Sequence, residues 1–260
     1  MIFPDIDPVI LSIGPIKIHW YSIAYIMGII FGFWYIKTLA RKQNLALDKL
    51  FIDDLFIYTI LGIILGGRLG FVMFYDPIHY INNPLEILYT WKGGMSFHGG
   101  MIGVILAIII TSRKHKINTW KILDITACAA PVGLFLGRIT NFINGELFGR
   151  ITDSKLGIIF PSGGPFPRHP SQIYEALGEG LLLFLILNYL YLVKKTYKTP
   201  GTTSGLFGLF YALIRIAIEF FREPNHNLGY FWQYFTMGQI LSCAMIVVAI
   251  IILKNTQTEK

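Results

Sequence analysis

The stretch that decides the fold is ILDITACAAPVGLFLGRITNFINGELFGR, residues 122–150. Its first half is an almost unbroken apolar run, whereas residues 137–150 hold two arginines, two asparagines and a glutamate. A charged side chain at membrane depth is costly unless it faces a partner or a cavity. The stretch therefore predicts a membrane-spanning helix that ends in a polar cluster, and this cluster must face the interior of a helix bundle because lipid would reject it.

The composition of the whole chain agrees with this reading. Of its 260 residues, 54% are hydrophobic and only 14% are charged, and the mean hydropathy is +0.57. Soluble domains carry about a quarter charged residues, so we expect an all-α integral membrane protein. In a membrane protein, an excess of positive charge such as the formal net charge of +7 lies mainly in the cytoplasmic loops, so it indicates the topology. No basic stripe with interleaved aromatic residues is present, so we expect no nucleic-acid partner.

Seven apolar segments are long enough to be membrane spans, which need roughly 20 residues. They are residues 19–38, 55–75, 97–112, 121–143, 171–193, 203–221 and 232–253. The third is short and rich in glycine. No segment reads as a separate soluble domain, so we expect residues 1–260 to form one polytopic membrane domain.

Lysine and arginine concentrate in alternate connections, which predicts the orientation of the spans. The cationic residues follow spans one, three and five and lie in the C-terminal tail: Lys37, Arg41, Lys42, Lys49, Arg113, Lys114, Lys116, Lys121, Lys194, Lys195, Lys198, Lys254 and Lys260. We therefore expect an outside N-terminus and a cytoplasmic C-terminus. Loops 76–96, 144–170 and 222–231 then lie outside, and the longest, 144–170, forms a small outward-facing head. A passive cap is the alternative role for this loop.

The sequence offers no metal or disulfide chemistry. Cys128 and Cys243 each lie inside an apolar run, and the histidines have no metal-ligand spacing. We expect no metal and no cofactor. The N-terminus lacks a basic region and carries prolines and aspartates, so it does not read as a cleavable signal peptide.

Polar side chains follow helical spacing inside several spans. Residues three or four apart share one helix face. The stripes are Tyr211, Arg215 and Glu219; Gln172, Glu175 and Glu179; and Arg138, Asn141 and Gly145. Any single pair, such as Arg215 with Glu219, could be purely structural. Arginine presents a planar fork that suits phosphate, so Arg68, Arg138, Arg215 and Arg222 together favour a phospholipid headgroup as ligand.

A histidine lies between glycine pairs in GGMSFHGGMIG, residues 93–103. Histidine is the side chain best suited to move a proton near neutral pH, and glycine lets a ligand approach closely. We interpret His98 as a functional residue. The alternative is that it only satisfies a backbone carbonyl.

The stretch GRITNFINGELFGR (137–150) closely resembles the signature of the bacterial prolipoprotein diacylglyceryl transferase family. GGRLGFVMFY, SFHGGMIG, RHPSQIYEA and RIAIEFFREP resemble further blocks of this family in the same order. The resemblance extends from IKIHWYSIAY to MGQIL, which is nearly the whole chain. Thr140 is a departure, because a small residue, usually glycine, is expected there, and we expect it to alter close packing.

The resemblance implies a fold and an activity. The fold has seven spans, an outside N-terminus and an outward-facing head, in the bacterial cytoplasmic (inner) membrane. The activity is transfer of the diacylglyceryl group of phosphatidylglycerol to the lipobox cysteine thiol of a preprolipoprotein, with release of glycerol phosphate. The implied partners are phosphatidylglycerol, lipobox peptides and the lipid bilayer, and we expect a monomer.

The family's important positions fall on named residues of this chain. The signature positions are Arg138, Asn141, Glu146 and Gly149, the histidine motif gives His98 and Gly99, and the other matches are Tyr21, Asp124, Tyr211, Arg215 and Glu219. To the substrate-binding set we add Arg68 as a phosphate-binding candidate.

These residues lead to a mechanistic hypothesis. Arg138 and Arg215 hold the phosphate that leaves, since cations must stabilise its charge. His98 takes the proton of the substrate thiol, because the thiolate is the nucleophile. Asn141 and Glu146 orient the headgroup or the arginines. The alternative base is a carboxylate such as Glu219, or an ordered water.

Three other classes of protein compete with this reading. A flippase for anionic lipids would also need polar stripes, but no inverted repeat is visible. Another headgroup transferase of a metal-dependent kind would need a run of aspartates, which the sequence lacks. A non-enzymatic membrane scaffold would not need a histidine between paired glycines together with buried arginines.

Overall fold

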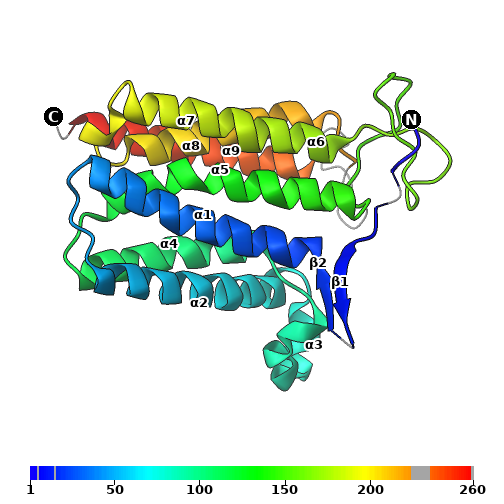
Figure 1. Ribbon diagram of the computed structural model, residues 1–260, viewed down its shortest axis with the longest axis horizontal. Helices are drawn as coiled ribbons and strands as arrows, with labels where there is room; N and C mark the ends of the chain where they lie inside the picture. Colours follow the sequence, from blue (N-terminus) through cyan, green and yellow to red (C-terminus); the bar gives the residue numbers. More distant parts are fainter. Residues whose placement is uncertain (5, 15, 224–234, 259–260) are drawn as a thin grey trace. The chain divides into compact units, whose positions relative to one another are not determined.

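The apolar segments fold as helices in the computed structural model, which describes residues 1–4, 6–14, 16–223 and 235–258 (Figure 1). The contacts divide the chain into two units, Met1–Ile36 with Asp124–Lys260, and Lys37–Leu123. Each unit is described by itself.

The first unit contains most of the long helices. Its elements are β1 (Val9–Ile13), β2 (Ile16–His19), most of α1 (Trp20–Lys42), most of α5 (Thr119–Ile143), α6 (Ser171–Glu175), a π-helical segment η3 (Ala176–Leu182), α7 (Leu183–Leu192), η4 (Thr196–Lys198), α8 (Thr202–Glu219) and α9 (Met237–Thr258). Helices α8 and α9 run antiparallel, because Gly205 near the start of α8 packs on Leu253 near the end of α9 and Gly238 packs on Glu219. The antiparallel hairpin β1–β2 precedes α1 and was not predicted from the sequence.

The second unit is an antiparallel helix pair with a helical connection. Its elements are α2 (Lys49–Phe74), α3 (Pro77–Asn82), η1 (Pro84–Leu88), η2 (Thr90–Lys92) and α4 (Phe97–Lys114). Glycines let the two long helices approach closely, because a Cβ added to Gly103 would lie 1.9 Å from the Gly62 carbonyl oxygen. Small residues at a helix interface are typical of membrane bundles.

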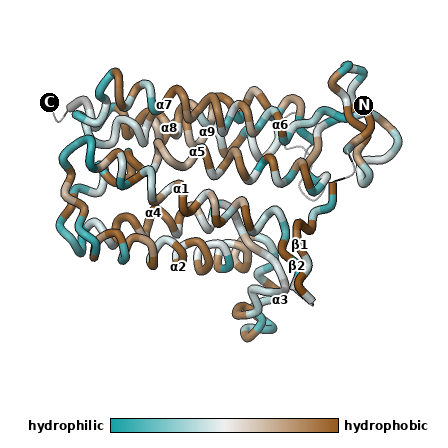
Figure 2. The backbone as a smooth tube through the Cα atoms, in the orientation of Figure 1, coloured by the Kyte–Doolittle hydropathy of each residue, from teal (hydrophilic) through white to brown (hydrophobic). Residues whose placement is uncertain are grey.

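Polar and apolar side chains are distributed as in a multi-pass membrane protein. Gln172, Glu175 and Glu179 are fully buried, whereas Ile30 on α1 is 64% exposed. Figure 2 shows the apolar colour concentrated along the helices and the hydrophilic colour in many of the connections. Because apolar side chains point outward in lipid and polar groups need internal partners, this arrangement fits a bilayer and would be unfavourable in water.

Six helices in the described residues are long and apolar enough to cross a membrane. They are Trp20–Lys42, Lys49–Phe74, Thr119–Ile143, Ser171–Leu192, Thr202–Glu219 and Met237–Thr256, and each matches a predicted span. The predicted third span, 97–112, forms helix α4, which is not among the six. Residues 232–234 of the predicted last span, and residues 224–231 of the predicted last outside loop, lie outside the described residues.

The N-terminal residues pair with the loop 144–170. The Met1 amine donates to the Gly157 carbonyl at 2.7 Å, and the Ile159 amide donates to the Met1 carbonyl at 2.9 Å. The Phe3 amide returns a hydrogen bond to the Ile159 carbonyl at 3.1 Å. The start of the chain and this loop therefore lie together within the first unit, as Figure 1 also shows.

Candidate active site

Six charged side chains, five of them from the helical segments α5, α6, η3 and α8, meet inside the first unit, and we call them the arginine–glutamate cluster. The cluster consists of Arg138 on α5, Glu175 on α6, Glu179 on η3, Arg215 and Glu219 on α8, and Arg222 just after α8.

Two glutamates bridge the arginines of different helices. Glu175 lies 3.0 Å from Arg138 Nε, 2.8 Å from Arg215 Nη1 and 3.4 Å from Arg222 Nη1. Glu179 lies 3.0 Å from Arg215 Nη1 and 3.5 Å from Arg138 Nη2. Arg138 and Arg215 are therefore held at a fixed separation by two shared carboxylates.

The cluster is neutral in sum but not uniformly buried. Three arginines face three glutamates, and a buried charge is tolerated only when it is paired. The side chains of Glu175 and Glu179 are 0% exposed, whereas those of Arg138 and Arg222 keep 19% and 20%. The arginines therefore form the accessible edge of the cluster, and this edge offers hydrogen-bond donors to an anion.

Not all of the carboxylate oxygens are satisfied. The Oε2 atoms of Glu175, Glu179 and Glu219 lie close to arginine nitrogens, yet they accept no well-directed hydrogen bond from the described residues. The contacts of Arg138 with these oxygens are therefore ion pairs without a directed hydrogen bond, whereas Arg215 Nη1 donates to Glu175 Oε1 at 2.8 Å and to Glu179 Oε1 at 3.0 Å.

Glycines allow the neighbouring helices to approach the two bridging glutamates. A Cβ added to Gly180 would lie 2.6 Å from Phe135 Cβ on α5, and one added to Gly178 would lie 2.8 Å from Ile214 on α8. Both glycines belong to the π-helical segment η3, a rare conformation that is frequent at functional sites. The ALGEGLL sequence of η3 thus brings α5 and α8 onto the glutamates.

The signature stretch, residues 137–150, begins inside α5 and is joined to α6 by hydrogen bonds. The Asn141 side-chain amide donates to Glu146 Oε1 at 2.8 Å, and Gln172 Nε2 donates to the Glu146 carbonyl at 2.6 Å. Asn141 is buried, whereas the side chain of Glu146 is exposed. Gly145 turns the chain with a φ of +64°, a value that favours glycine.

The loop 144–170 is fixed to the end of α8 by backbone pairing. The Gly149 amide donates to the His169 carbonyl at 2.8 Å, and the Arg150 amide donates to the Phe221 carbonyl at 2.9 Å. A Cβ at position 149 would lie 2.4 Å from the Phe221 carbonyl oxygen, so only glycine fits there. Burial of His169 lowers the pKa of its imidazole.

A buried aspartate sets the position of α8. Asp124 on α5 accepts hydrogen bonds from the Gly201 amide at 2.8 Å, the Ser204 amide at 2.7 Å and the Ser204 hydroxyl at 2.6 Å. It therefore caps the N-terminus of the helix that carries Arg215.

Thr140 adds no unpaired polar group to α5. Its hydroxyl donates to the Leu136 carbonyl of its own helix at 2.9 Å. The departure from the small residue of the family pattern is thus accommodated locally.

Several predicted site residues come together in the first unit. Arg138, Arg215 and Glu219 belong to the cluster. Asn141 lies near the end of α5, and Glu146 and Gly149 lie in the stretch that follows this helix. Tyr211 lies one turn before Arg215 and stacks on Phe207 with a centroid distance of 5.9 Å. Tyr21 on α1 packs against Tyr25 at 5.0 Å.

Three predicted residues belong to the second unit. Arg68 is buried and donates to the carbonyls of Ile87 at 2.8 Å, Gly93 at 2.6 Å, Gly94 at 3.1 Å and Glu86 at 2.6 Å. Four hydrogen bonds use most of the five N–H groups of a guanidinium, so Arg68 holds the 84–94 connection.

Gly99 and His98 lie at the start of α4. A Cβ on Gly99 would lie 2.1 Å from the Gly66 carbonyl oxygen, so this glycine is a packing residue between α2 and α4. His98 is the second residue of α4 and its side chain is exposed.

Three residues of the cluster, Glu175, Glu179 and Arg222, were left out of the predicted site although the sequence carried a signal for them. Arg222 was one of the four arginines that favoured a phospholipid headgroup. Glu175 and Glu179 share a helical stripe with Gln172, which indicates an inward face. Spacing alone could not name their partners on α5 and α8. Among the residues that the structure describes, no group of three or more histidine, cysteine, aspartate or glutamate side chains is arranged to hold a metal ion.

Comparisons with known proteins agree with the resemblance seen in the sequence. The sequence model described as "Prolipoprotein diacylglyceryl transferase" matches residues 8–254. A phosphatidylglycerol–prolipoprotein diacylglyceryl transferase of Wolbachia sp. subsp. Brugia malayi is 52% identical over 257 residues, which cover 98% of this chain and 97% of the relative. The Rickettsia felis enzyme of the same name is 53% identical over 247 residues, or 95% of each chain. The chain therefore belongs to the prolipoprotein diacylglyceryl transferase family.

Proposed function

We propose that the arginine–glutamate cluster is the phosphate-binding part of the active site of a phosphatidylglycerol–prolipoprotein diacylglyceryl transferase. The enzyme transfers the diacylglyceryl group of phosphatidylglycerol to the lipobox cysteine of a preprolipoprotein. The bond between the glycerol carbon and the phosphate oxygen breaks, and a carbon–sulfur bond forms. The thiol loses its proton, and glycerol phosphate leaves as an anion.

The observation that carries the proposal is the shared pair of carboxylates between Arg138 and Arg215. Glu175 and Glu179 hold both guanidinium groups, one from α5 and one from α8, while the arginine edge keeps some exposure. Preorganised donors are most effective where charge develops in the transition state. Two fixed arginines would stabilise the phosphate oxygens as the bond to carbon breaks.

The proton of the thiol needs a base, and His98 is the proposed one. Glu219 or an ordered water is the alternative. Asn141 and Glu146 would orient the headgroup, because their mutual hydrogen bond leaves the Glu146 side chain exposed next to the end of α5. Further substrate contacts are proposed for Tyr21, Arg68, Gly99, Gly149, Tyr211 and Glu219. Of these, Arg68 and Gly99 have the strongest structural roles in their own unit.

We also infer the topology. Helix α4 would cross the membrane as well, which would bring the number of spans to seven. The lysine-rich connections would then lie in the cytoplasm and the N-terminus outside. The pairing of Met1 with Gly157 supports a common side for the N-terminus and the loop 144–170. The whole chain would act as a monomeric single domain of the bacterial inner membrane, with this loop in its outward-facing head.

The test is a transfer assay with purified protein in liposomes of phosphatidylglycerol and a lipobox peptide. Mass spectrometry follows the peptide, and a second assay follows glycerol phosphate. We expect the wild type to add one diacylglyceryl mass, and Arg138→Ala, Arg215→Lys and His98→Gln to lose most of the activity. Arg113→Ala is the matched control, because Arg113 is an exposed cation at the end of α4.

Each outcome of this assay decides a separate point. Retained activity in His98→Gln would remove the base role of this histidine. Full activity in Arg215→Lys would show that a forked guanidinium is not needed on α8. If folded wild-type protein adds no mass but moves labelled phosphatidylglycerol between leaflets, the flippase reading replaces the transferase.

A further inference from the structure

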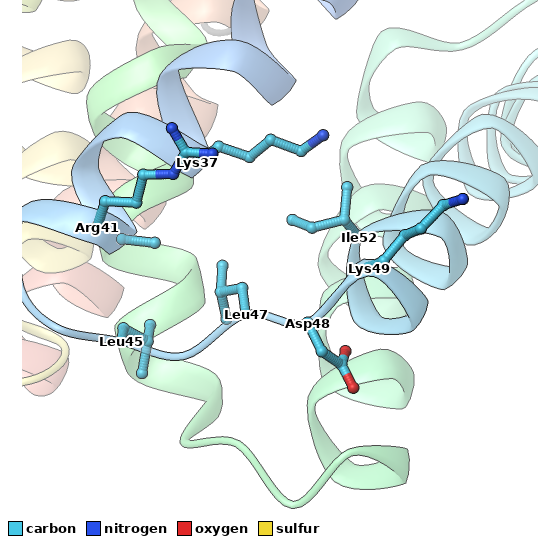
Figure 3. Close-up of a pocket in the computed structure, with 8 residues that line it drawn as sticks. Lys37, Arg41, Leu45, Leu47, Asp48, Lys49 and Ile52 are labelled. Atoms are coloured by element: carbon cyan, nitrogen blue, oxygen red, sulfur yellow. The ribbon is translucent and has the colours of Figure 1, made fainter.

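A small cationic pocket opens where α1 ends and α2 begins, within the second unit. It has a volume of about 220 Å³ and is lined by Lys37, Ala40, Arg41, Leu45, Leu47, Asp48, Lys49 and Ile52. Figure 3 shows the Lys37 and Arg41 side chains beside each other on α1, with Ile52 of α2 across the pocket and Lys49 directed away on its far rim.

The two cations of α1 have no carboxylate partner within the described parts of the chain. Neither the Lys37 ammonium nor the Arg41 guanidinium is in an ion pair or side-chain hydrogen bond there, and both side chains are exposed. By contrast, Lys114 in the same unit pairs with Asp54 at 2.8 Å. Like charges four residues apart on a helix repel each other, so an anion between Lys37 and Arg41 would remove an unfavourable contact.

The acidic residue of the pocket does not neutralise these cations. The Asp48 carboxylate accepts a hydrogen bond from the Phe51 amide at 2.7 Å, as the N-cap of α2. Its orientation toward the helix backbone is visible in Figure 3, where it points away from Lys37. The start of the 26-residue helix α2 adds the positive end of its dipole to the same place.

The remaining lining is apolar. Ala40, Leu45, Leu47 and Ile52 form this part, next to a helix pair whose outer surface is apolar, with Ile57 of α2 52% exposed. A soluble phosphate would use only the cations, whereas a phospholipid would use the cations for its phosphate and the apolar wall for its glycerol and acyl stems.

We propose that this pocket binds the phosphate group of an anionic phospholipid that is not the reacting substrate. The helix α1 has 23 residues and is about 34 Å long at 1.5 Å per residue, so its two ends reach opposite faces of a bilayer. In the orientation inferred above the pocket opens to the cytoplasmic leaflet, where basic pockets between helices recognise anionic headgroups. The bound lipid would fix the α1–α2 corner.

The experiment measures lipid retention rather than activity, so it does not depend on the proposed site residues. The full chain is reconstituted in phosphatidylcholine nanodiscs that contain a minor fraction of phosphatidic acid, which has no glycerol headgroup to release. After extraction into mild detergent, native mass spectrometry counts the phosphatidic acid that stays bound. The pocket variant is Lys37→Gln with Arg41→Gln, and the matched control is Lys195→Gln with Lys198→Gln, which removes the same charge from another lysine-rich connection.

We expect the control to retain one phosphatidic acid, as the wild type does. The pocket variant should bind it roughly 30-fold more weakly, because each lysine or arginine at an anionic surface contributes about a fivefold factor to the binding constant. Equal unfolding temperatures in phosphatidylcholine alone verify that both variants fold. Equal binding by the two variants would overturn the proposal, because diffuse surface charge then explains the attraction. If soluble glycerol phosphate at matched concentration displaces the lipid, the pocket binds a soluble phosphate ester, and the proposal of a phospholipid ligand is overturned.

Discussion

The charge balance of the arginine–glutamate cluster gives the sharpest prediction, and Glu175→Gln is the change that tests it. The substitution keeps the size of the side chain and removes one negative charge. Glu175 touches Arg138, Arg215 and Arg222 at 3.0, 2.8 and 3.4 Å. The cluster therefore changes from three positive and three negative charges to three positive and two negative.

The size of the expected loss of stability depends on the ion-pair partners that each arginine keeps in Glu175→Gln. Removal of one partner from a buried ion pair costs about 3–5 kcal/mol. Arg138 and Arg215 still have Glu179 at 3.5 and 3.0 Å, and Arg222 is exposed enough to regain water. We therefore expect the free energy of unfolding to fall by about 3 kcal/mol, the lower end of that range.

A second substitution restores neutrality and separates charge from shape. In Glu175→Gln with Arg222→Gln, two arginines face two glutamates again. We expect the double variant to be more stable than Glu175→Gln alone, a coupling of roughly 1–2 kcal/mol for residues in one ion-pair network. Glycerol phosphate should raise the unfolding midpoint of Glu175→Gln more than that of the wild type, because the anion supplies the missing charge.

The measurement is equilibrium unfolding in detergent micelles, with and without glycerol phosphate, on the wild type, both single variants and the double variant. The reasoning is refuted if Glu175→Gln changes the unfolding free energy by less than about 0.5 kcal/mol, the range of ordinary surface changes. It is also refuted if the two single effects simply add, because the cluster would then not behave as one electrostatic unit.

Three further predictions concern the supports of the site. Gly149→Ala should abolish transfer in a lipobox-peptide assay, because its Cβ would lie 2.4 Å from the Phe221 carbonyl oxygen, whereas equal activity would show that the backbone can shift. Asp124→Asn weakens the cap of α8, and we expect a loss of about 1–3 kcal/mol in detergent unfolding with a lower transfer rate; an unchanged unfolding midpoint would contradict it. Burial lowers the pKa of His169, so the neutral imidazole favours the folded loop 144–170. The stability should be complete above the unfolded pKa of about 6.5 and should decrease as the pH falls below it. A His169→Gln variant with the same pH profile of unfolding would refute this.

The spans could be predicted because they depend on composition and length alone. An apolar run such as 122–136 must be a helix in lipid, since every backbone group needs an internal partner. The six helices that can cross a membrane accordingly match predicted segments. The hairpin β1–β2 could not be predicted, because PDIDPVILSIGPIKIHW mixes prolines and aspartates with short apolar runs that carry no clear period.

The site was only partly predictable, because spacing gives the face of a helix and not the partner of a side chain. Arg68 and Arg138 looked alike as intramembrane arginines. The structure gives Arg68 four backbone carbonyls and Arg138 two glutamates. The difference arises from the 84–94 connection that folds over Arg68, and such long-range geometry is absent from a local pattern.

The neutral charge balance of the cluster explains how this chain keeps three arginines inside a helix bundle, because each positive charge is matched by a glutamate. Without Glu175 and Glu179 the guanidinium groups would have to remain hydrated, and the bundle would open to water. With the glutamates in place the arginines are held in position, but the Oε2 atoms of both carboxylates lack well-directed hydrogen bonds. In the proposed binding mode, a phosphate at the exposed edge of Arg138 would compete with ion pairs that lack a directed hydrogen bond. The proposed phosphate site would thus rest on glutamates that hold the arginines in place and leave the edge of Arg138 accessible.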